Sequence, residues 1–265
     1  MADTRARSAT AEDLQRTVRM LPVALHFAWG DIRARYRRSF LGPLWLVLGT
    51  AIGVLGMGYL WSGILGVGYA EYVPSLAAGL VTWQLLAGTI AESPSMLVYN
   101  APIIRNVRTP VAFFPLQLLL RHLLTFAHNA VIVLAVLLVY PPDWSPTQLL
   151  SIAGLALVAG NLWWISLVLG MLGARFRDLD PLVAAALPLL FFLTPVVFRP
   201  DHVPVSHNIV WLNPLTYFIT VIRDPLRGEV PPAFVYVVVL TVLAGGWVVA
   251  YWLLTRRAFR VPFWI

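Results

Sequence analysis

The stretch RARYRRSFLGPLW, residues 33–45, places four arginines immediately before a long apolar run. Such a cluster is typical of a nucleic-acid-binding arm, a targeting segment or the inner end of a membrane span. The composition of the whole chain decides among these, because 59% of its 265 residues are hydrophobic and only 12% are charged. An average soluble domain has roughly 25% charged residues. The chain is therefore predicted to be an all-α polytopic membrane protein, with this arginine cluster at the membrane surface.

The basic residues are all arginines, 19 in number, and the formal net charge is +7. In a membrane protein a basic excess reports topology and contact with anionic headgroups, so we expect membrane lipids and no nucleic acid as partners. The absence of lysine excludes the loop GxxxxGK[ST], whose lysine reaches nucleotide phosphates. ATP-driven work therefore requires ATP and Mg²⁺ on a second subunit. With no cysteine, we expect no disulfide, and no cofactor or metal site in this chain.

Long apolar segments recur along the chain, and a helix needs about 20 such residues to cross the hydrocarbon core. In the fifth segment, Pro181, Pro188 and Pro195 recur every seven residues. Pro188 lies inside it, so we expect a bent or broken helix there. The predicted spans are six: 41–66, 73–94, 117–140, 148–173, 181–199 and 233–254.

The distribution of arginine predicts the orientation of these spans. Fifteen of the 19 arginines precede the first span or lie in the segments 99–110, 174–180 and 255–265. Three lie at 199–232, and Arg121 lies in or near the third span. The positive-inside rule then predicts that both termini lie in the cytoplasm.

The segment before the first span has helical periodicity. Apolar residues recur at steps of three and four, which predicts an amphipathic helix in the interface plane, bent near Pro22. We expect two regions: a cytoplasmic N-terminal segment, 1–40, and a single transmembrane domain, 41–265. The periodic positions are Leu14, Val18, Leu21, Leu25, Ala28, Ile32 and Tyr36.

Polar residues inside the spans are candidates for a translocation path. Arg121, Thr125, His128 and Asn129 form a stripe on the third span. An arginine inside the bilayer costs about 2.5–3.5 kcal/mol on insertion scales, so the stripe either lines a polar path or makes interhelical hydrogen bonds. Glu92 could couple protons, or could cap a helix or form an ion pair. Further path candidates, because aromatic faces stack on sugars, are Asn161, Trp163 and Trp164.

Two further segments carry polar chemistry. Asp178 and Asp180 form a DxD, which could hold a metal–nucleotide sugar or could simply form a cytoplasmic turn beside Arg175 and Arg177. The segment 205–228 is too apolar for a wet loop and is interrupted at Asn213. We interpret it as a re-entrant outer hairpin between the fifth and sixth spans.

These segments together resemble a known family. GDIRARYRRSFLGPLWLVL (30–48), ARFRDLDP (174–181), TPVVF (194–198) and LNPLTYFITVIRDPLRG (212–228) resemble, in order, parts of the membrane subunits of bacterial polysaccharide ABC exporters. The resemblance covers about residues 26–230, and the best-fitting branch is the O-antigen type.

The resemblance implies a permease subunit that is not an enzyme, acting as a homodimer with two copies of a separate ABC ATPase. It implies a polysaccharide cargo attached to a polyprenyl-pyrophosphate lipid, whose headgroup could bind Arg33, Arg35, Arg37 and Arg38 because guanidinium pairs bidentately with phosphate. It also implies that the ATPase docks on the N-terminal helix and on a cytoplasmic loop containing Asn100, Arg105, Asn106 and Arg108. The outer hairpin would shape the exit through Asn213, Tyr217, Arg223 and Asp224.

Three alternatives stay open at this point. The same architecture also exports drugs or small lipids. A proton-coupled secondary transporter would use Glu92, Arg121 and His128, and a membrane glycosyltransferase would use Asp178 and Asp180. No internal repeat of the kind common in secondary transporters is evident in the sequence.

Overall fold

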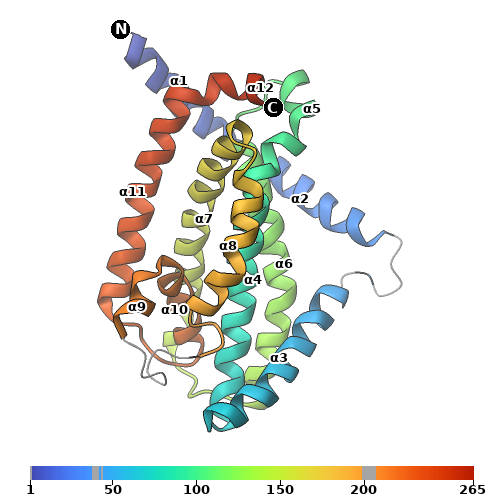
Figure 1. Cartoon of the computed structure of the whole chain (residues 1–265), viewed down its shortest axis with the longest axis vertical. Helices are drawn as coiled ribbons and strands as arrows, with labels where there is room; N and C mark the ends of the chain where they lie inside the picture. The colour runs from blue at the N-terminus through green and yellow to red at the C-terminus, as the bar shows by residue number, and fades with distance from the viewer. Residues whose placement is uncertain (1, 38–41, 43, 199–206) are drawn as a thin grey trace.

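The structure is a computed structural model that describes residues 2–37, 42, 44–198 and 207–265, and all regular structure in these residues is helical. Figure 1 shows a long helical bundle with both termini at one end. We call this end the arginine end; it consists of α1 (Ala2–Arg19), α5 (Ala101–Asn106), the turn 176–178 and α12 (Val261–Trp264). The opposite end carries the turns at 66–68 and 140–145.

Five helices in the described part of the chain are long and apolar enough to cross a membrane. They agree with five of the six predicted spans. α3 ends because Gly66 adopts a left-handed conformation, with φ of +66°. The five helices, with the 3₁₀ turns that extend two of them, are α3 (Leu44–Leu65), α4 (Tyr69–Tyr99), α6 (Phe113–Val139), α7 (Leu150–Arg175, preceded by η1, Pro146–Leu149) and α11 (Ala233–Arg257, followed by η3, Ala258–Arg260).

The fifth predicted span is a shorter helix, α8 (Leu179–Leu193), of 15 residues. α8 runs through Pro188 without interruption, so the expected break is not there. The helix ends two residues before Pro195, which cannot donate a backbone hydrogen bond. The region predicted as a hairpin contains two helices, α9 (His207–Leu212) and α10 (Pro214–Leu226), separated at Asn213 as the sequence indicated.

The N-terminal segment is helical and breaks next to Pro22, as predicted. α1 and α2 (Leu21–Tyr36) meet at Met20, and α2 packs along α6. The buried face of α2, however, is narrower than the predicted stripe, since Ala24, Ala28 and Ile32 are buried while Leu21 and Leu25 are each 44% exposed. Except for the exposed His26, the first half of α2 consists of apolar residues, which suits a helix immersed in the bilayer interface.

The core is held by close helix contacts at glycines. A Cβ on Gly154 of α7 would lie 2.1 Å from the Val221 carbonyl oxygen of α10, and one on Gly173 would lie 2.2 Å from the Pro94 carbonyl oxygen of α4. α4 is the central helix: it contacts α3, α6, α7, α8 and α10. These contacts position the two polar clusters that join α4 to α3 and α6.

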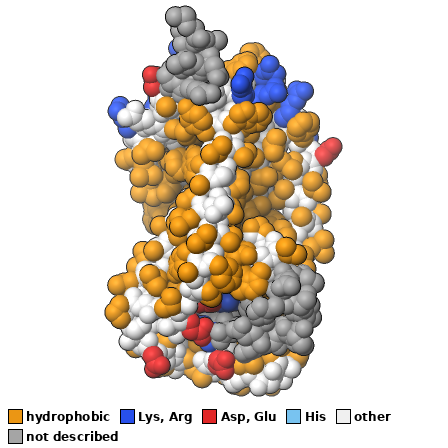
Figure 2. All heavy atoms as spheres, turned by 90° about the vertical axis from the view of Figure 1, so that its left-hand side faces the viewer, with side chains coloured by type: hydrophobic (Ala, Val, Ile, Leu, Met, Phe, Trp, Pro, Cys, Tyr) orange, Lys and Arg blue, Asp and Glu red, His pale blue; other side chains and the backbone are white. Residues whose placement is uncertain are grey.

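The surface fits a bilayer. Figure 2 shows the face that carries α11, where hydrophobic side chains extend along most of the bundle. The arginine side chains visible on this face gather mainly at the arginine end. That end also receives the arginines of α5, the turn 176–178 and the end of α11. The arginines of α5, of the turn 176–178 and of the end of α11, which the sequence assigned to one membrane side, therefore lie at the same end of the bundle.

Candidate functional site

A charged cluster joins α4 to α6. The Arg121 guanidinium donates to the Glu92 carboxylate, and His122 Nε2 lies 3.4 Å from Glu92 Oε1. Gly88 makes room for the imidazole, because a Cβ there would lie 2.8 Å from two ring atoms of His122. The Arg121 side chain is 19% exposed and that of Glu92 is 41% exposed. Glu92 therefore forms an ion pair, which was one of the expected roles; proton coupling stays a prediction.

A second polar cluster ties α3 to the same two helices. Asn129 Nδ2 of α6 donates to Gln84 Oε1 of α4 at 2.8 Å, and Gln84 Nε2 donates to Thr50 Oγ1 of α3 at 3.0 Å. Thr50 and Asn129 are buried. The three helices are therefore joined through hydrogen bonds in the apolar part of the bundle, where few competing partners exist.

The remaining residues of the predicted stripe face α2 or their own backbone. Thr125 Oγ1 donates to the Arg121 carbonyl oxygen at 3.0 Å. The His128 ring stacks on Trp29 of α2, with centroids 6.4 Å apart. Gln117, which the sequence argument did not single out, donates to Asp31 of α2 at 3.1 Å. The stripe thus makes interhelical contacts; a role along a translocation path stays a prediction.

Asn161 and the two tryptophans beside it contact α11 and α6. Asn161 is buried, its Nδ2 donates to the Leu157 carbonyl oxygen at 2.9 Å, and its Oδ1 accepts from Trp164 Nε1 at 3.1 Å. A Cβ on Gly246 of α11 would lie 2.0 Å from the Trp164 ring. Trp163 packs edge to face on Trp247 of α11, at 4.9 Å and 82°. These contacts account for the conformation of each side chain without a sugar ligand.

The segment 194–197, which follows α8, is irregular, buried and held from three sides. Arg223 of α10 donates to the Pro195 carbonyl oxygen at 2.6 Å and to Asp224 Oδ1 at 2.9 Å, and only 2% of its side chain is exposed. Asn213 Nδ2 donates to Thr194 Oγ1 at 2.7 Å. Irregular backbone at membrane depth requires internal partners of this kind.

The same segment contacts α4 as well. The Tyr72 hydroxyl donates to the Val197 carbonyl oxygen at 2.7 Å, and Gly79 lets the Val196 carbonyl oxygen approach to within 2.9 Å of a Cβ placed there. The TPVVF and LNPLTYFITVIRDPLRG segments are thus physically interlocked. Three of the four outer-gate candidates, Asn213, Arg223 and Asp224, meet at this clamp on residues 194–197. The fourth, Tyr217, donates instead to the Trp211 carbonyl oxygen at 2.8 Å.

The headgroup candidates lie at the C-terminal end of α2. Arg33, Arg35 and Arg37 are exposed, and their side chains make no hydrogen bond or ion pair with a described residue. Arg38 lies outside the described residues. The three described guanidinium groups are therefore available to an anion from outside the chain.

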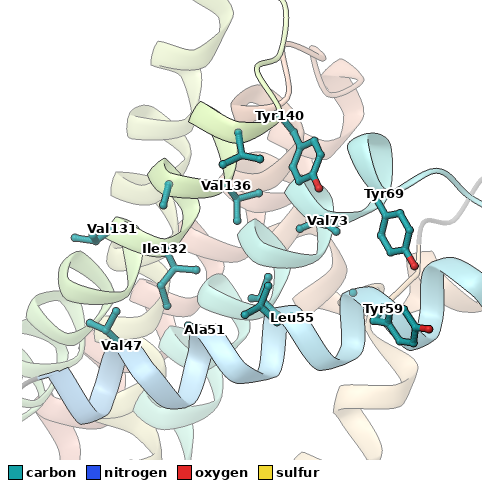
Figure 3. Close-up of a pocket in the computed structure, with 14 residues that line it drawn as sticks. Val47, Ala51, Leu55, Tyr59, Tyr69, Val73, Val131, Ile132, Val136 and Tyr140 are labelled. Carbon is teal, nitrogen blue, oxygen red and sulfur yellow. The ribbon is translucent and has the colours of Figure 1, made fainter.

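An apolar groove of about 530 Å³ lies among α3, α4 and α6 (Figure 3). It follows α3 from Val47 to Tyr59, a rise of about 18 Å over twelve residues. Tyr69 and Tyr140 join Tyr59 at the far end, and the Tyr59 and Tyr69 rings stack at 6.5 Å. The groove suits an extended hydrocarbon chain.

The docking candidates lie on and around α5. Asn100 Nδ2 donates to the Met96 carbonyl oxygen at 2.9 Å, and Asn106 Nδ2 donates to that of Pro102 at 2.7 Å. The Arg105 guanidinium donates to the Ile265 carbonyl oxygen. Arg108 is exposed and makes no side-chain contact of these kinds with a described residue.

The turn 176–178 belongs to the same surface as α5. Arg177 Nη2 donates to the Trp264 carbonyl oxygen at 3.3 Å, and the Arg175 guanidinium lies 5.7 Å from the centroid of the Trp264 ring. Both arginines therefore contact Trp264 of α12, and no ion pair between them and Asp178 or Asp180 is present among the described residues. Within the described residues no three acidic or histidine side chains gather in a way that could hold a metal ion.

The described polar residues thus form hydrogen-bonded contacts between spans, a row of exposed arginines at the end of α2 and a composite surface at the arginine end. The profile of the ABC-2 type transporter family matches residues 24–226. The chain belongs to this family. It is thus a type-2 ABC exporter permease, a multi-pass membrane transport subunit, which agrees with the resemblance seen in the ordered motifs.

Individual relatives point to one branch of this family. The chain is 28% identical over 200 residues to the O-antigen export system permease protein RfbA of Klebsiella pneumoniae, covering 73% of this chain and 76% of the relative. It is 25% identical over 170 residues to the O-antigen export system permease protein RfbA of Myxococcus xanthus, covering 63% of this chain and 65% of that relative.

Sequence reasoning missed several residues that complete these clusters. Gln84 and Thr50 connect α3 to α4, and His122 completes the charged cluster. Gln84 carried a detectable signal, since an amide inside an apolar span requires a partner. No comparable signal in the sequence marked Tyr72, because tyrosines near span ends are ordinary interface residues.

Proposed function

We propose that this chain is the permease of an exporter that moves a polysaccharide, attached to a polyprenyl-pyrophosphate lipid, outward across the bacterial inner membrane. A separate ABC ATPase binds ATP and Mg²⁺ and drives the movement. The family match over residues 24–226 carries this proposal, together with relatives whose names specify O-antigen export. The absence of lysine supports the division of labour, since a phosphate-binding loop requires one.

The orientation and the docking surface follow from the arginine end. We place this end, with both termini, in the cytoplasm, because cytoplasmic segments accumulate arginine. The ATPase docks on α1, α5 and the turn 176–178. Arg108 is the exposed cation at the centre of this proposal, and Arg105 holds α5 against α12.

The lipid-linked end of the cargo fits two neighbouring features. Arg33, Arg35, Arg37 and Arg38 bind the pyrophosphate, and the groove along α3 accommodates part of the polyprenyl chain. The arginines precede the start of α3 by only a few residues, so headgroup and chain contacts follow each other along the sequence. On the outer side, α9 and α10 form the re-entrant hairpin that shapes the exit.

Two copies of the chain complete the conduit. α8 buries none of its side chains within one copy, and Leu189 and Phe192 are 67% and 72% exposed. A second copy packed on this face would enclose a path for a polymer too large for any hollow within one chain. Drug or small-lipid export is the alternative within the family, and the names of the relatives favour polysaccharide.

The test is co-purification of the tagged chain with the ATPase encoded beside it, followed by transport in inverted membrane vesicles. We expect a complex of two plus two subunits and export that stops when ATP is removed. Export that survives ATP depletion and fails with an uncoupler would instead favour proton coupling through Glu92, Arg121 and His128. Sugar transfer by the purified chain alone would establish the glycosyltransferase alternative.

The cargo is tested separately. In cells lacking their own exporter, the reconstituted pair should restore surface polysaccharide. Replacing Arg33, Arg35, Arg37 and Arg38 by Gln should leave lipid-linked polysaccharide inside, with normal membrane insertion. Unchanged export in that variant would contradict the headgroup assignment while leaving the exporter class intact.

A further inference from the structure

A second hollow, of about 520 Å³, lies beside the second half of α1, against α7 and α11. It shares no residue with the α3 groove or the charged cluster. Its surface is almost wholly apolar, and two of its lining residues, Gln15 and Arg19, end in polar groups. The lining residues are Leu14, Gln15, Val18, Arg19, Trp163 and Trp247.

α1 packs on α11 near the end of that helix, where Thr255 Oγ1 donates to Thr10 Oγ1 at 3.1 Å. Farther along α1, Val18 lines the hollow and is 55% exposed. The edge-to-face pair of Trp163 and Trp247 provides the apolar surface opposite.

Arg19 is the one charged residue among the described residues that line the hollow. Its side chain is exposed and makes no hydrogen bond or ion pair with a described residue. Gln15, one turn earlier on α1, is also exposed.

This combination selects one class of occupant. A water-soluble anion would satisfy Arg19 but would leave two indole rings and two aliphatic side chains against water. A neutral lipid would cover the apolar surface and would leave the guanidinium without a counter-charge. A lipid with a negative headgroup satisfies both, and α1 lies at the bilayer surface where such lipids are present.

We propose that this hollow binds one anionic phospholipid of the bilayer. Its phosphate pairs with Arg19 and Gln15, and an acyl chain packs on Trp163 and Trp247. The bound lipid fills the space between α1 and the bundle and so holds α1 in place. This site does not depend on the identity of the exported cargo.

The experiment uses the full chain in nanodiscs of phosphatidylcholine with increasing phosphatidylglycerol, with thermal unfolding as the readout. Wild-type protein should be stabilised in a saturable manner by phosphatidylglycerol. Arg19→Gln should weaken the apparent affinity about fivefold, the value expected for one basic residue at an anionic surface. Arg257→Gln, an exposed arginine at the same end that does not line the hollow, is the matched control and should change nothing.

Location is tested with phosphatidylglycerol whose acyl chains are brominated, because bromine quenches nearby tryptophans. Replacing Trp163 and Trp247 by Phe should remove a saturable part of the quenching, and Val18→Trp, which fills the hollow, should prevent saturation. Equal effects of Arg19→Gln and Arg257→Gln would overturn the proposal. So would equal stabilisation by phosphatidylcholine, or displacement of the lipid by inorganic phosphate.

Discussion

Replacement of Arg223 by Met tests the clamp on residues 194–197 directly. The substitution keeps an unbranched side chain of similar length and removes the guanidinium. Arg223 is 2% exposed and donates to Asp224 and to the Pro195 carbonyl oxygen, so both acceptors lose their partner. Breaking one side of a buried ion pair costs about 3–5 kcal/mol.

The lower end of that range applies here, because 16% of the Asp224 side chain remains exposed to a solvating environment. A loss of about 3 kcal/mol changes the unfolding equilibrium roughly 150-fold. At about 2–4 °C per kcal/mol for a chain of this size, the midpoint of thermal unfolding should fall by about 6–12 °C. The measurement is thermal unfolding of the purified protein in nanodiscs.

Two companion variants separate the ion pair from a general loss of packing. Arg223→Met with Asp224→Asn removes the stranded carboxylate, so the double variant should recover part of the loss. Arg257→Met, at an exposed position, should leave the midpoint unchanged. A midpoint for Arg223→Met within 2 °C of the wild type, or strict additivity in the double variant, would refute this account of the clamp.

Three further predictions concern other contacts. Gly154→Ala should cost about 1–3 kcal/mol through overpacking against α10, whereas Gly49→Ala, which has nothing within 4 Å, should be neutral; paired thermal unfolding curves check this. Glu92→Arg and Arg121→Glu should each lower the yield of folded protein, and the double exchange should restore it, which size-exclusion profiles would show; a double variant no better than either single one contradicts the ion pair. Gln84→Leu should speed amide hydrogen exchange in α3 but not in α7, as measured by mass spectrometry. Equal exchange in the wild type and the variant would argue against the hydrogen-bonded connection between α3 and α4 at Gln84.

The apolar pattern predicted the helices well because a bilayer leaves the backbone little choice. Five spans, the break at Pro22 and the interruption at Asn213 follow from hydropathy, proline chemistry and capping preference. The position at which α8 ends, by contrast, was not predictable from the sequence. Pro188 is tolerated inside this helix, so a proline alone does not specify where a membrane helix stops.

The candidate site was predicted in part. Arg121 and Asn129 were recognised as polar residues in a span, but their partners Glu92 and Gln84 lie on another helix, and only packing reveals which helices meet. Arg223 was assigned to the outer gate through the resemblance alone, and the sequence did not indicate that its side chain would be nearly fully buried against residues 194–197. The sequence identifies a polar residue that is unfavourable to bury, whereas tertiary structure determines which partner compensates for its burial.

The length of α8 has a consequence for the membrane itself. Fifteen residues rise about 22 Å, whereas the hydrocarbon core of a typical bilayer is about 30 Å thick. The buried segment 194–197 continues the polypeptide beyond the helix without its regular hydrogen bonds, so a single copy presents a shorter apolar surface to lipids here. Lipids relieve such a mismatch by thinning locally, at a fraction of a kcal/mol per Å. Until a second copy covers α8, the bilayer should therefore be thinnest along it, and removal of this mismatch would favour the pairing of two copies through this face.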